Sequence, residues 1–350
     1  MITKLKLENF KGIKKGEIEL APLTILLGPN NAGKTTILEA LFLAPNPLRL
    51  TPYMMEKNMM GRRMLRALEV VREIHKTLKY EGFLFLLNYY ISDHAEITCW
   101  SKNSTHRILF FRREMDLLVE TDAKVSHITD AERRFYILAE LPYSLLSPNG
   151  HNIYYDKPII EDSIMFHPRL YKLGIWYIHY NWIPIVNAGT CRKVAKEVSH
   201  FSTEKYGDLT LEPFIRGEVE LNMYTKERCR IRVGDIGDGI QSLVVYKILI
   251  EDRSPPIILW DDIESHFNPR ILMHVADWFS DLVSQNGKQV IISTHSLEAA
   301  ELLSSANDDA RIILVKLEEG ILKSRVISPD ELRELRKLGV DIRMAEGMLL

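Results

Sequence analysis

The alternation of apolar and charged residues predicts β-strands at the start of the chain. Residues 2–10, ITKLKLENF, alternate with a period of two, and residues 17–28 predict a second strand that leads into a third. Residues 29–44 then predict a loop that turns into a helix. Near the C-terminus, the apolar runs PPIILW, KQVIIST and ARIILVKLEEG are separated by helical segments. This alternation of strand and helix is typical of a largely parallel sheet.

The middle of the chain has a different pattern. Residues 53–90 predict helix with a methionine cluster and many basic residues, and residues 95–160 predict short strands. The apolar run at 173–182, LGIWYIHYNW, predicts a buried strand. The basic helix is either a surface that faces DNA phosphates or a solvated helix face. The methionines form either an adaptable surface for a partner or the packed core of a lid.

The segments around residue 200 and the tail complete the pattern. TCRKVAKEVSHFS and GIQSLVVYKILIED predict helices, and GEVELNMYT with RCRIRVG predicts a hairpin. The tail, SPDELRELRKLGVDIR, predicts a capped, charged helix.

Composition narrows the class of protein. A chain of 350 residues with 26% charged residues and a net charge of −2 is ordinary for a globular protein and argues against a globally basic nucleic-acid binder. The three cysteines are far apart and form no CxxC pair, which excludes a zinc ribbon and suits a reducing compartment. The N-terminus carries no signal sequence, and no apolar run is long enough to span a membrane. We therefore expect a soluble cytoplasmic protein without a membrane partner.

A phosphate-binding loop is the clearest chemical motif. GPNNAGKT, residues 28–35, fits G-x-x-x-x-G-K-[ST] and lies between a predicted strand and a predicted helix. The glycines allow backbone N–H groups to surround phosphate oxygens, Lys34 reaches the β- and γ-phosphates, and Thr35 is placed to bind Mg²⁺. We expect ATP to contact Gly28, Pro29, Asn30, Asn31, Ala32, Gly33, Lys34, Thr35 and Thr36.

A second motif is the acidic end of a buried strand in IILWDDIESHFNP, residues 257–269. A buried carboxylate is costly unless it is paired or binds a metal, so Asp261 is expected to hold Mg²⁺ with Thr35. Asp262 is then placed to orient or deprotonate the attacking water. The alternative is that both acids only cap the following helix.

Two further features fit the same chemistry. VIISTHS, residues 290–296, is a buried strand that ends in His295, which is either a sensor of the γ-phosphate or a structural histidine. GDIGDGIQS, residues 234–242, is a glycine-rich turn before a helix. It either closes over the γ-phosphate from a second subunit or is a flexible turn.

Together these motifs resemble the ATP-binding-cassette (ABC) type of head found in the RecF, SMC and OLD-type ATPases. Residues 2–42 are similar to the opening of that family, IGDGIQSL to its signature turn, WDDIESHFNP to its Walker B and D-loop, and STHS to its switch histidine. The resemblance implies head-to-head dimers that enclose two ATP molecules, with Asp238 and Gly239 contacting nucleotide across the interface. Residues 265–268 would line the same interface.

The chain also departs from the family pattern. Asp262 stands where the family usually has a catalytic glutamate, so hydrolysis is expected to be slow or to need a partner, with Glu264 as the fallback base. The signature serine is replaced, and the usual Q-loop glutamine is absent, with Asn181 or His179 as candidate substitutes.

These observations predict an α/β fold: a P-loop NTPase of the ABC type with an N-terminal antiparallel β subdomain and an inserted α+β arm or lid. Residues 1–45 and 173–328 are expected to form the head, 46–172 the arm and 329–350 a C-terminal helix or tail. Only about 55 residues follow His295, with no long acidic segment, so no built-in Toprim nuclease domain is expected.

The leading functional hypothesis is a Mg²⁺-dependent ATPase that dimerises on ATP and acts on DNA, in repair, chromosome maintenance or defence. The alternative is a nucleotide-gated switch that hydrolyses little and controls a separate effector such as a nuclease. A small-molecule kinase leaves the signature turn without a role, and a membrane transporter subunit fits the N-terminal LENFKGI poorly.

Overall fold

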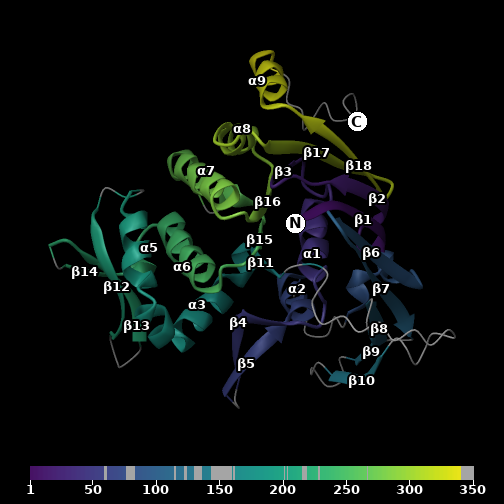
Figure 1. The fold of residues 1–350 in the computed structure, drawn as a ribbon, viewed down its shortest axis with the longest axis horizontal. Coiled ribbons are helices and arrows are strands. Elements are labelled where there is room, and N and C mark those ends of the chain that lie inside the picture. The colour runs from purple at the N-terminus through teal and green to yellow at the C-terminus, as the bar shows by residue number, and fades with distance from the viewer. Residues whose placement is uncertain are drawn as a thin grey trace.

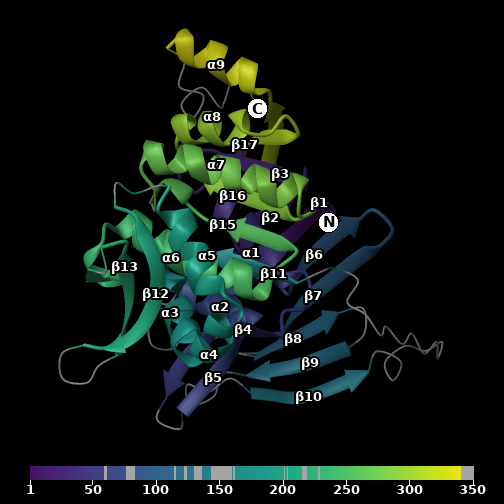
Figure 2. The same cartoon turned by 60° about the vertical axis from the view of Figure 1, so that its left-hand side comes forward.

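The computed structural model describes residues 1–58, 61–75, 83–113, 116–121, 124–129, 136–142, 160, 162–200, 202, 204–214, 219–227, 229–265 and 267–339. Figures 1 and 2 show a large twisted sheet at the centre, with helices packed against it and a small separate sheet at one end. Among the described residues, no helix is both long and apolar enough to cross a membrane.

The large sheet has 13 strands in the order β10-β9-β8-β7-β6-β1-β2-β18-β17-β3-β16-β15-β11. Its first half is antiparallel and contains β1 (Ile2–Phe10), β2 (Ile13–Glu19), β6 (His94–Ser101), β7 (Thr105–Arg113), β8 (Asp116–Thr121), β9 (Lys124–Thr129) and β10 (Tyr136–Pro142). β18 (Ile321–Ile327) follows β2 in the sheet; it pairs with β2 in parallel and with the next strand in the order, β17, in an antiparallel manner. The antiparallel pairing predicted for the N-terminal strands is confirmed by β1 and β2.

The second half of the sheet is parallel and carries the core. β3 (Leu23–Leu27) lies between β16 (Gln289–Thr294) and β17 (Ala310–Glu318), and β15 (Ile257–Trp260) and β11 (Ser163–Phe166) extend the sheet beyond β16. Each residue of β15 and β16 is buried, because helices cover both faces of a parallel sheet. Parallel pairing brings the carboxyl ends of these strands to the same edge, where the predicted motifs follow.

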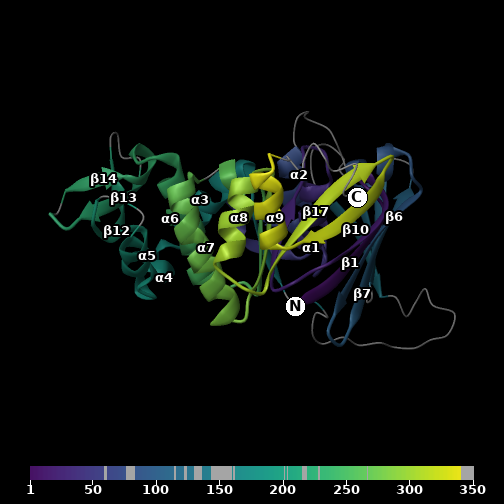
Figure 3. The same ribbon diagram turned by 90° about the horizontal axis from the view of Figure 1, so that it is seen from above.

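Helices flank this parallel half. They are α1 (Lys34–Leu43), α6 (Asp238–Arg253), α7 (Pro269–Ser284), α8 (Leu297–Ser305) and α9 (Pro329–Lys337). Viewed from above, α6, α7, α8 and α9 follow one another beside the sheet (Figure 3). Ser328 caps α9 by accepting a hydrogen bond from the N–H of Glu331, which confirms the predicted capped helix.

A smaller sheet of three strands lies at the end of the molecule that holds α5. β12 (Tyr206–Pro213) pairs with β13 (Val219–Thr225), which pairs with β14 (Arg230–Arg232) as the predicted hairpin. The predicted helix at its base is α5 (Thr190–Val198), and the short helix α4 (Trp182–Asn187) precedes it.

The expectation of helix throughout residues 53–90 is wrong. β4 (Leu50–Asn58) and β5 (Gly61–Arg66) form a hairpin, and only α2 (Ala67–His75) is an α-helix in the described part of this segment. The basic residues therefore do not share one helix: Arg62 and Arg63 belong to β5, Arg72 belongs to α2, and Lys76 and Lys79 lie outside the described residues. The methionine cluster is also split, since Met54 is buried, Met64 is 40% exposed, and Met59 and Met60 lie outside the described residues.

The predicted strand at 173–182 is a helix, α3 (Tyr171–Tyr180). Its buried residues are Gly174, Tyr177 and Ile178, a spacing of three and four that belongs to one helix face. A short apolar run cannot be assigned to strand or helix by periodicity alone, and the many aromatic residues here favoured the wrong choice.

The pairing of strands bears on the domain division. β6 pairs with β1, and β11 pairs with β15, although both β6 and β11 fall inside the segment 46–172 that the sequence predicts to be an arm. The division into head and arm stays a prediction. β11 itself is part of the sheet that positions the site.

Candidate functional site

The P-loop connects β3 to α1 and contains two residues with a left-handed backbone. Asn31 and Gly33 have positive φ values of 64° and 91°, which turn successive N–H groups toward one side. A side chain at position 28 would place its Cβ 2.4 Å from the carbonyl oxygen of Val315 in β17, so only glycine fits there. The first N–H groups of α1 point out of the same loop because the first turn of a helix has no partners for them.

Lys34 lies over this loop. Its side chain is buried, and Nζ donates hydrogen bonds to the carbonyl oxygens of Gly28 and Pro29, both at 2.8 Å. Burial lowers the pKa of Lys34, while the nearby carboxylates of Asp262, Asp261 and Glu264 oppose that shift. The ammonium is thus held at the mouth of the P-loop, where a phosphate oxygen can accept a hydrogen bond from its third N–H.

Asp261 lies beside Thr35, as predicted. The Thr35 hydroxyl is 2.9 Å from Oδ2 of Asp261, and Ser293 at the end of β16 donates to Oδ1. Burial raises the pKa of Asp261 to about 6, with the charge of Asp262 adding to the rise, while the hydrogen bonds from Ser293 and Thr35 favour the ionised form. The three strands β3, β15 and β16 therefore bring Thr35, Asp261 and Ser293 together from positions far apart in sequence.

Asp262 occupies a left-handed backbone conformation, with φ of 45°. Its N–H donates to the Ser293 hydroxyl at 2.9 Å, so one serine holds both adjacent acids. Burial and the negative charge of Glu264 raise the pKa of Asp262. No hydrogen bond from another described residue reaches its carboxylate, which is half-buried and faces the same space as Lys34.

Glu264 and His295 form a pair next to Asp262. Oε1 of Glu264 is 2.6 Å from both the N–H and Nδ1 of His295, and the imidazole is 48% exposed. The other oxygen of Glu264 is buried and has no hydrogen-bond partner among the described residues. One ligand atom from each of Asp262, Glu264 and His295 lies within 4.8 Å of the others, a spacing that suits a bound water or cation.

The residues around Thr35 fit a magnesium ion. Mg²⁺ prefers hard oxygen ligands, and the Thr35 hydroxyl and the Asp261 carboxylate supply them. Asp261, Asp262 and Glu264 also place three carboxylates near the single ammonium of Lys34. This excess of negative charge at a phosphate-binding loop favours a divalent cation that would accompany the nucleotide.

The signature turn lies at the start of α6. Asp238 begins the helix and is exposed, and the Gln241 side chain donates to the Ile236 carbonyl at 2.6 Å and so closes the turn. Asp238 and Gly239 stay predicted contacts to nucleotide across a dimer interface. Of the predicted interface residues 265–268, residue 266 lies outside the described part of the chain.

The sequence patterns did not predict that His167 lies beside Asp261. His167 directly follows β11, and its Nε2 lies 3.7 Å from Oδ2 of Asp261. The suggested substitutes for the Q-loop glutamine lie elsewhere: Asn181 donates to the Tyr177 carbonyl and the Met55 sulfur at the end of α3. The sequence SIMFHP could have indicated this residue, because an apolar strand is followed there by a histidine, as in VIISTHS before His295.

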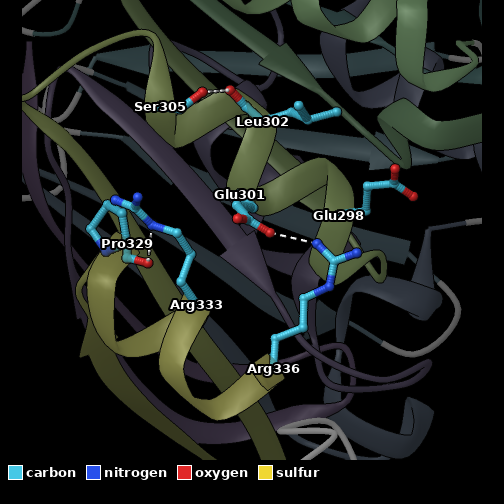
Figure 4. Close-up of a pocket in the computed structure, with 7 residues that line it drawn as sticks. All are labelled: Glu298, Glu301, Leu302, Ser305, Pro329, Arg333 and Arg336. Atoms are coloured by element: carbon cyan, nitrogen blue, oxygen red, sulfur yellow. Dashed lines mark hydrogen bonds and ion pairs between the residues drawn. The ribbon is translucent and has the colours of Figure 1, made fainter. Parts of the chain in front are cut away.

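A separate pocket lies between α8 and α9, away from the P-loop residues. It has a volume of about 270 Å³, and Figure 4 shows Arg336 of α9 reaching Glu301 of α8, an ion pair of 2.5 Å. None of the residues predicted to bind nucleotide or metal lines this pocket. Its ion pair fixes α9 against the helix that follows His295.

Comparisons with known proteins show which families and structures the chain resembles. Residues 1–145 match the family described as "AAA ATPase domain", and residues 228–301 match "AAA domain, putative AbiEii toxin, Type IV TA system". Between them these two matches contain the P-loop, the signature turn, Asp261, Asp262, Glu264 and His295.

Two curated relatives extend over most of the chain. An OLD nuclease of Thermus scotoductus is 22% identical over 97% of this chain and 68% of its own length, and an ATP/GTP phosphatase of Helicobacter pylori is 24% identical over 87% of each. The crystal structure of an SMC head bound to the C-winged helix domain of ScpA matches with a TM-score of 0.54 and 18% identity, over 95% of this chain and 99% of that one.

These matches confirm the resemblance to the ABC-type P-loop ATPase heads of the RecF/SMC/OLD-like group that the motifs indicated, and they confirm the predicted α/β fold class.

Proposed function

We propose that this protein binds ATP with Mg²⁺ at the P-loop and hydrolyses it, with Asp262 as the base that activates water. The observation that carries the proposal is the convergence of Lys34, Asp261, Asp262 and the Glu264–His295 pair at the carboxyl ends of β3, β15 and β16. Such a group serves phosphoryl transfer, in which catalysis consists almost entirely of positioning and electrostatic stabilisation.

Each residue has a role that follows from its position. The N–H groups of the P-loop and the Lys34 ammonium neutralise the phosphates, and Thr35 with Asp261 would hold Mg²⁺, which supplies further positive charge as the β–γ bond breaks. The raised pKa of Asp262 makes its carboxylate a better proton acceptor than an exposed aspartate. Glu264 accepts a hydrogen bond from Nδ1 of His295, so Nε2 would donate to the γ-phosphate when the ring is protonated.

ATP-dependent dimerisation is part of the proposal. Asp238 is exposed at the start of α6, so a second copy can approach this turn and contribute its backbone N–H groups to the γ-phosphate. Action on DNA, and control of a separate nuclease, are suggested by relatives whose names include a nuclease and SMC heads. Arg63 of β5, whose side chain is 39% exposed, is a candidate for such a contact.

One observation favours the second candidate, a nucleotide-gated switch that hydrolyses little. Asp262 is one methylene shorter than a glutamate, and its left-handed backbone is fixed by the Ser293 hydroxyl. Glu264, the fallback base, is already engaged by His295. In this case ATP closes the dimer, and a partner must complete the site before hydrolysis proceeds.

The test is steady-state hydrolysis of Mg²⁺·ATP by the full chain and three variants. Asp262→Asn is expected to lower turnover by about 10²- to 10⁴-fold, the usual contribution of a general base. Lys34→Ala should lose ATP binding, and Glu264→Gln should reduce turnover less than Asp262→Asn. Full activity in Asp262→Asn would contradict the role of Asp262, and ATP binding without turnover in the natural chain would favour the switch.

A further inference from the structure

The imidazole of His167 is brought to the metal-binding carboxylate by strand register alone. β11 and β15 are parallel, with Phe166 opposite Trp260, so the next residues, His167 and Asp261, leave the sheet side by side. The N–H of Asp261 donates to the carbonyl oxygen of Phe166 at 2.9 Å, which fixes the two strand ends together. The His167 side chain is 15% exposed, and Nε2 faces Oδ2 of Asp261 at 3.7 Å.

A hydrogen bond to Nδ1 determines which nitrogen of the neutral His167 ring carries the proton. Nδ1 of His167 accepts a hydrogen bond from the backbone N–H of Arg169 at 3.1 Å. A nitrogen that accepts must carry a lone pair, so in the neutral ring the proton is on Nε2. The nitrogen that faces Asp261 is therefore a donor, and it cannot ligate a metal without a change of tautomer and loss of the bond to Arg169.

We infer that His167 is a positioning residue for the magnesium site: its Nε2–H donates to Asp261 and fixes the direction in which that carboxylate presents its oxygens to the ion. This rests on the proposed function. The 3.7 Å distance closes to a hydrogen bond by a movement of less than about 1 Å, as is common when a catalytic site binds its ligand. Residues that donate a hydrogen bond to a metal ligand, and so fix its orientation, are a recurrent feature of metal sites.

The segment that fixes the ring is itself anchored. Arg169 Nη1 donates to the carbonyl oxygen of Ile74 at 2.6 Å, near the end of α2. α2 also contacts the turn that begins with Pro168, so the helix after the β4–β5 hairpin supports the loop that holds His167. Two hydrogen bonds, from Arg169 to the Ile74 carbonyl and from the Arg169 N–H to His167, thus connect α2 to the imidazole that faces Asp261.

A matched pair of substitutions separates the two nitrogens. In His167→Gln the side-chain amide nitrogen can take the place of Nε2, so a donor toward Asp261 is retained. In His167→Asn the shorter amide can replace only Nδ1, and the donor is lost. The measurement is the Mg²⁺ concentration that gives half-maximal binding of a fluorescent ATP analogue by the full chain. Binding in EDTA and the thermal unfolding midpoint serve as controls for nucleotide affinity and for folding.

The expected result is a half-maximal Mg²⁺ concentration about 10- to 100-fold higher in His167→Asn and close to that of the natural chain in His167→Gln. Binding in EDTA and the unfolding midpoint should not differ between the two variants. Equal Mg²⁺ dependence in all three proteins would overturn the inference, and so would an equal loss in both variants.

A spectroscopic measurement tests direct ligation. With Mn²⁺ in place of Mg²⁺, electron spin-echo spectra of the ADP complex report any ¹⁴N nucleus bound directly to the metal. We expect the spectra of the natural chain and of His167→Gln to be the same in this respect. A directly bound ¹⁴N that is present in the natural chain and absent in His167→Gln would make His167 a ligand and overturn the inference. Failure of the proposed function is distinguishable, because then the natural chain would bind no ATP and Lys34→Ala would have no effect.

Discussion

Glu39 should be the most sensitive charged residue of the P-loop helix. It lies one turn after Thr35 in α1, its side chain is fully buried, and its carboxylate binds Lys11 of the β1–β2 turn and His75 of α2. The change Glu39→Gln removes the negative charge that faces the Lys11 ammonium and the His75 ring. The Lys11 ammonium and His75 ring lie only 2.6 Å apart, so their mutual repulsion is no longer offset when both are charged.

The magnitude follows from burial. Removing one partner of a buried ion pair costs about 3–5 kcal/mol in the free energy of unfolding. The Lys11 side chain is 12% exposed and His75 is 37% exposed, so water can partly hydrate both, and the lower end applies. At about 2 °C per kcal/mol for a large domain, the thermal unfolding midpoint should fall by about 6 °C.

The effect should also depend on pH. Burial alone would raise the pKa of Glu39, but the charge of Lys11 and the hydrogen bond from His75 outweigh it and hold the pKa below its ordinary value. A depressed carboxyl pKa contributes stability above the unfolded pKa of about 4.3, and that contribution is lost as the pH falls. The difference between the natural chain and Glu39→Gln should therefore be constant near neutral pH and shrink below about pH 4.3.

The assay is thermal unfolding followed by circular dichroism at several pH values. Glu17→Gln is the matched control, because Glu17 is 63% exposed and pairs with Lys4 at 3.0 Å. That exposed pair should contribute no more than about 1 kcal/mol. Unfolding midpoints of Glu39→Gln and Glu17→Gln that agree within about 1 °C would show that the change breaks no buried ion pair, which would refute the expected cost.

Other substitutions test the site itself. Ser293→Ala removes a donor to Asp261 and should lower the free energy of unfolding by about 1.5–3 kcal/mol in urea titrations, whereas an unchanged midpoint would deny that contact any role. Gly28→Ala puts a Cβ 2.4 Å from a backbone oxygen and should abolish ATP binding in equilibrium titrations; full binding would contradict the close approach of β17. Arg169→Met should raise the half-maximal Mg²⁺ concentration by a smaller factor than His167→Asn, and a larger rise would make Arg169 the dominant residue.

The parts of the fold that sequence could predict are those with local signals. A G-x-x-x-x-G-K-[ST] loop between strand and helix, and an apolar run ending in Asp261, are short patterns whose residues are needed where they stand. The same holds for the cap of α9 at Ser328. Each pattern implies its structure without knowledge of distant contacts.

The rest depends on tertiary packing. The β4–β5 hairpin is rich in methionine and basic residues that also favour helix, and its strand pairing decides its structure. α3 looked like a strand because its aromatic residues obscured a helical spacing. His167 could be placed next to Asp261 only once β11 was known to pair with β15 in parallel, since 94 residues separate the two in the chain.

The central claim is that the P-loop of this chain binds ATP together with Mg²⁺. Equilibrium titration of the purified full chain with ATP, with Mg²⁺ and then with EDTA, tests it most directly when Lys34→Ala is measured beside the natural protein. We expect binding of one ATP per chain that tightens with Mg²⁺ and is lost in Lys34→Ala. Binding that is absent in the natural chain, or unchanged in Lys34→Ala, would contradict it.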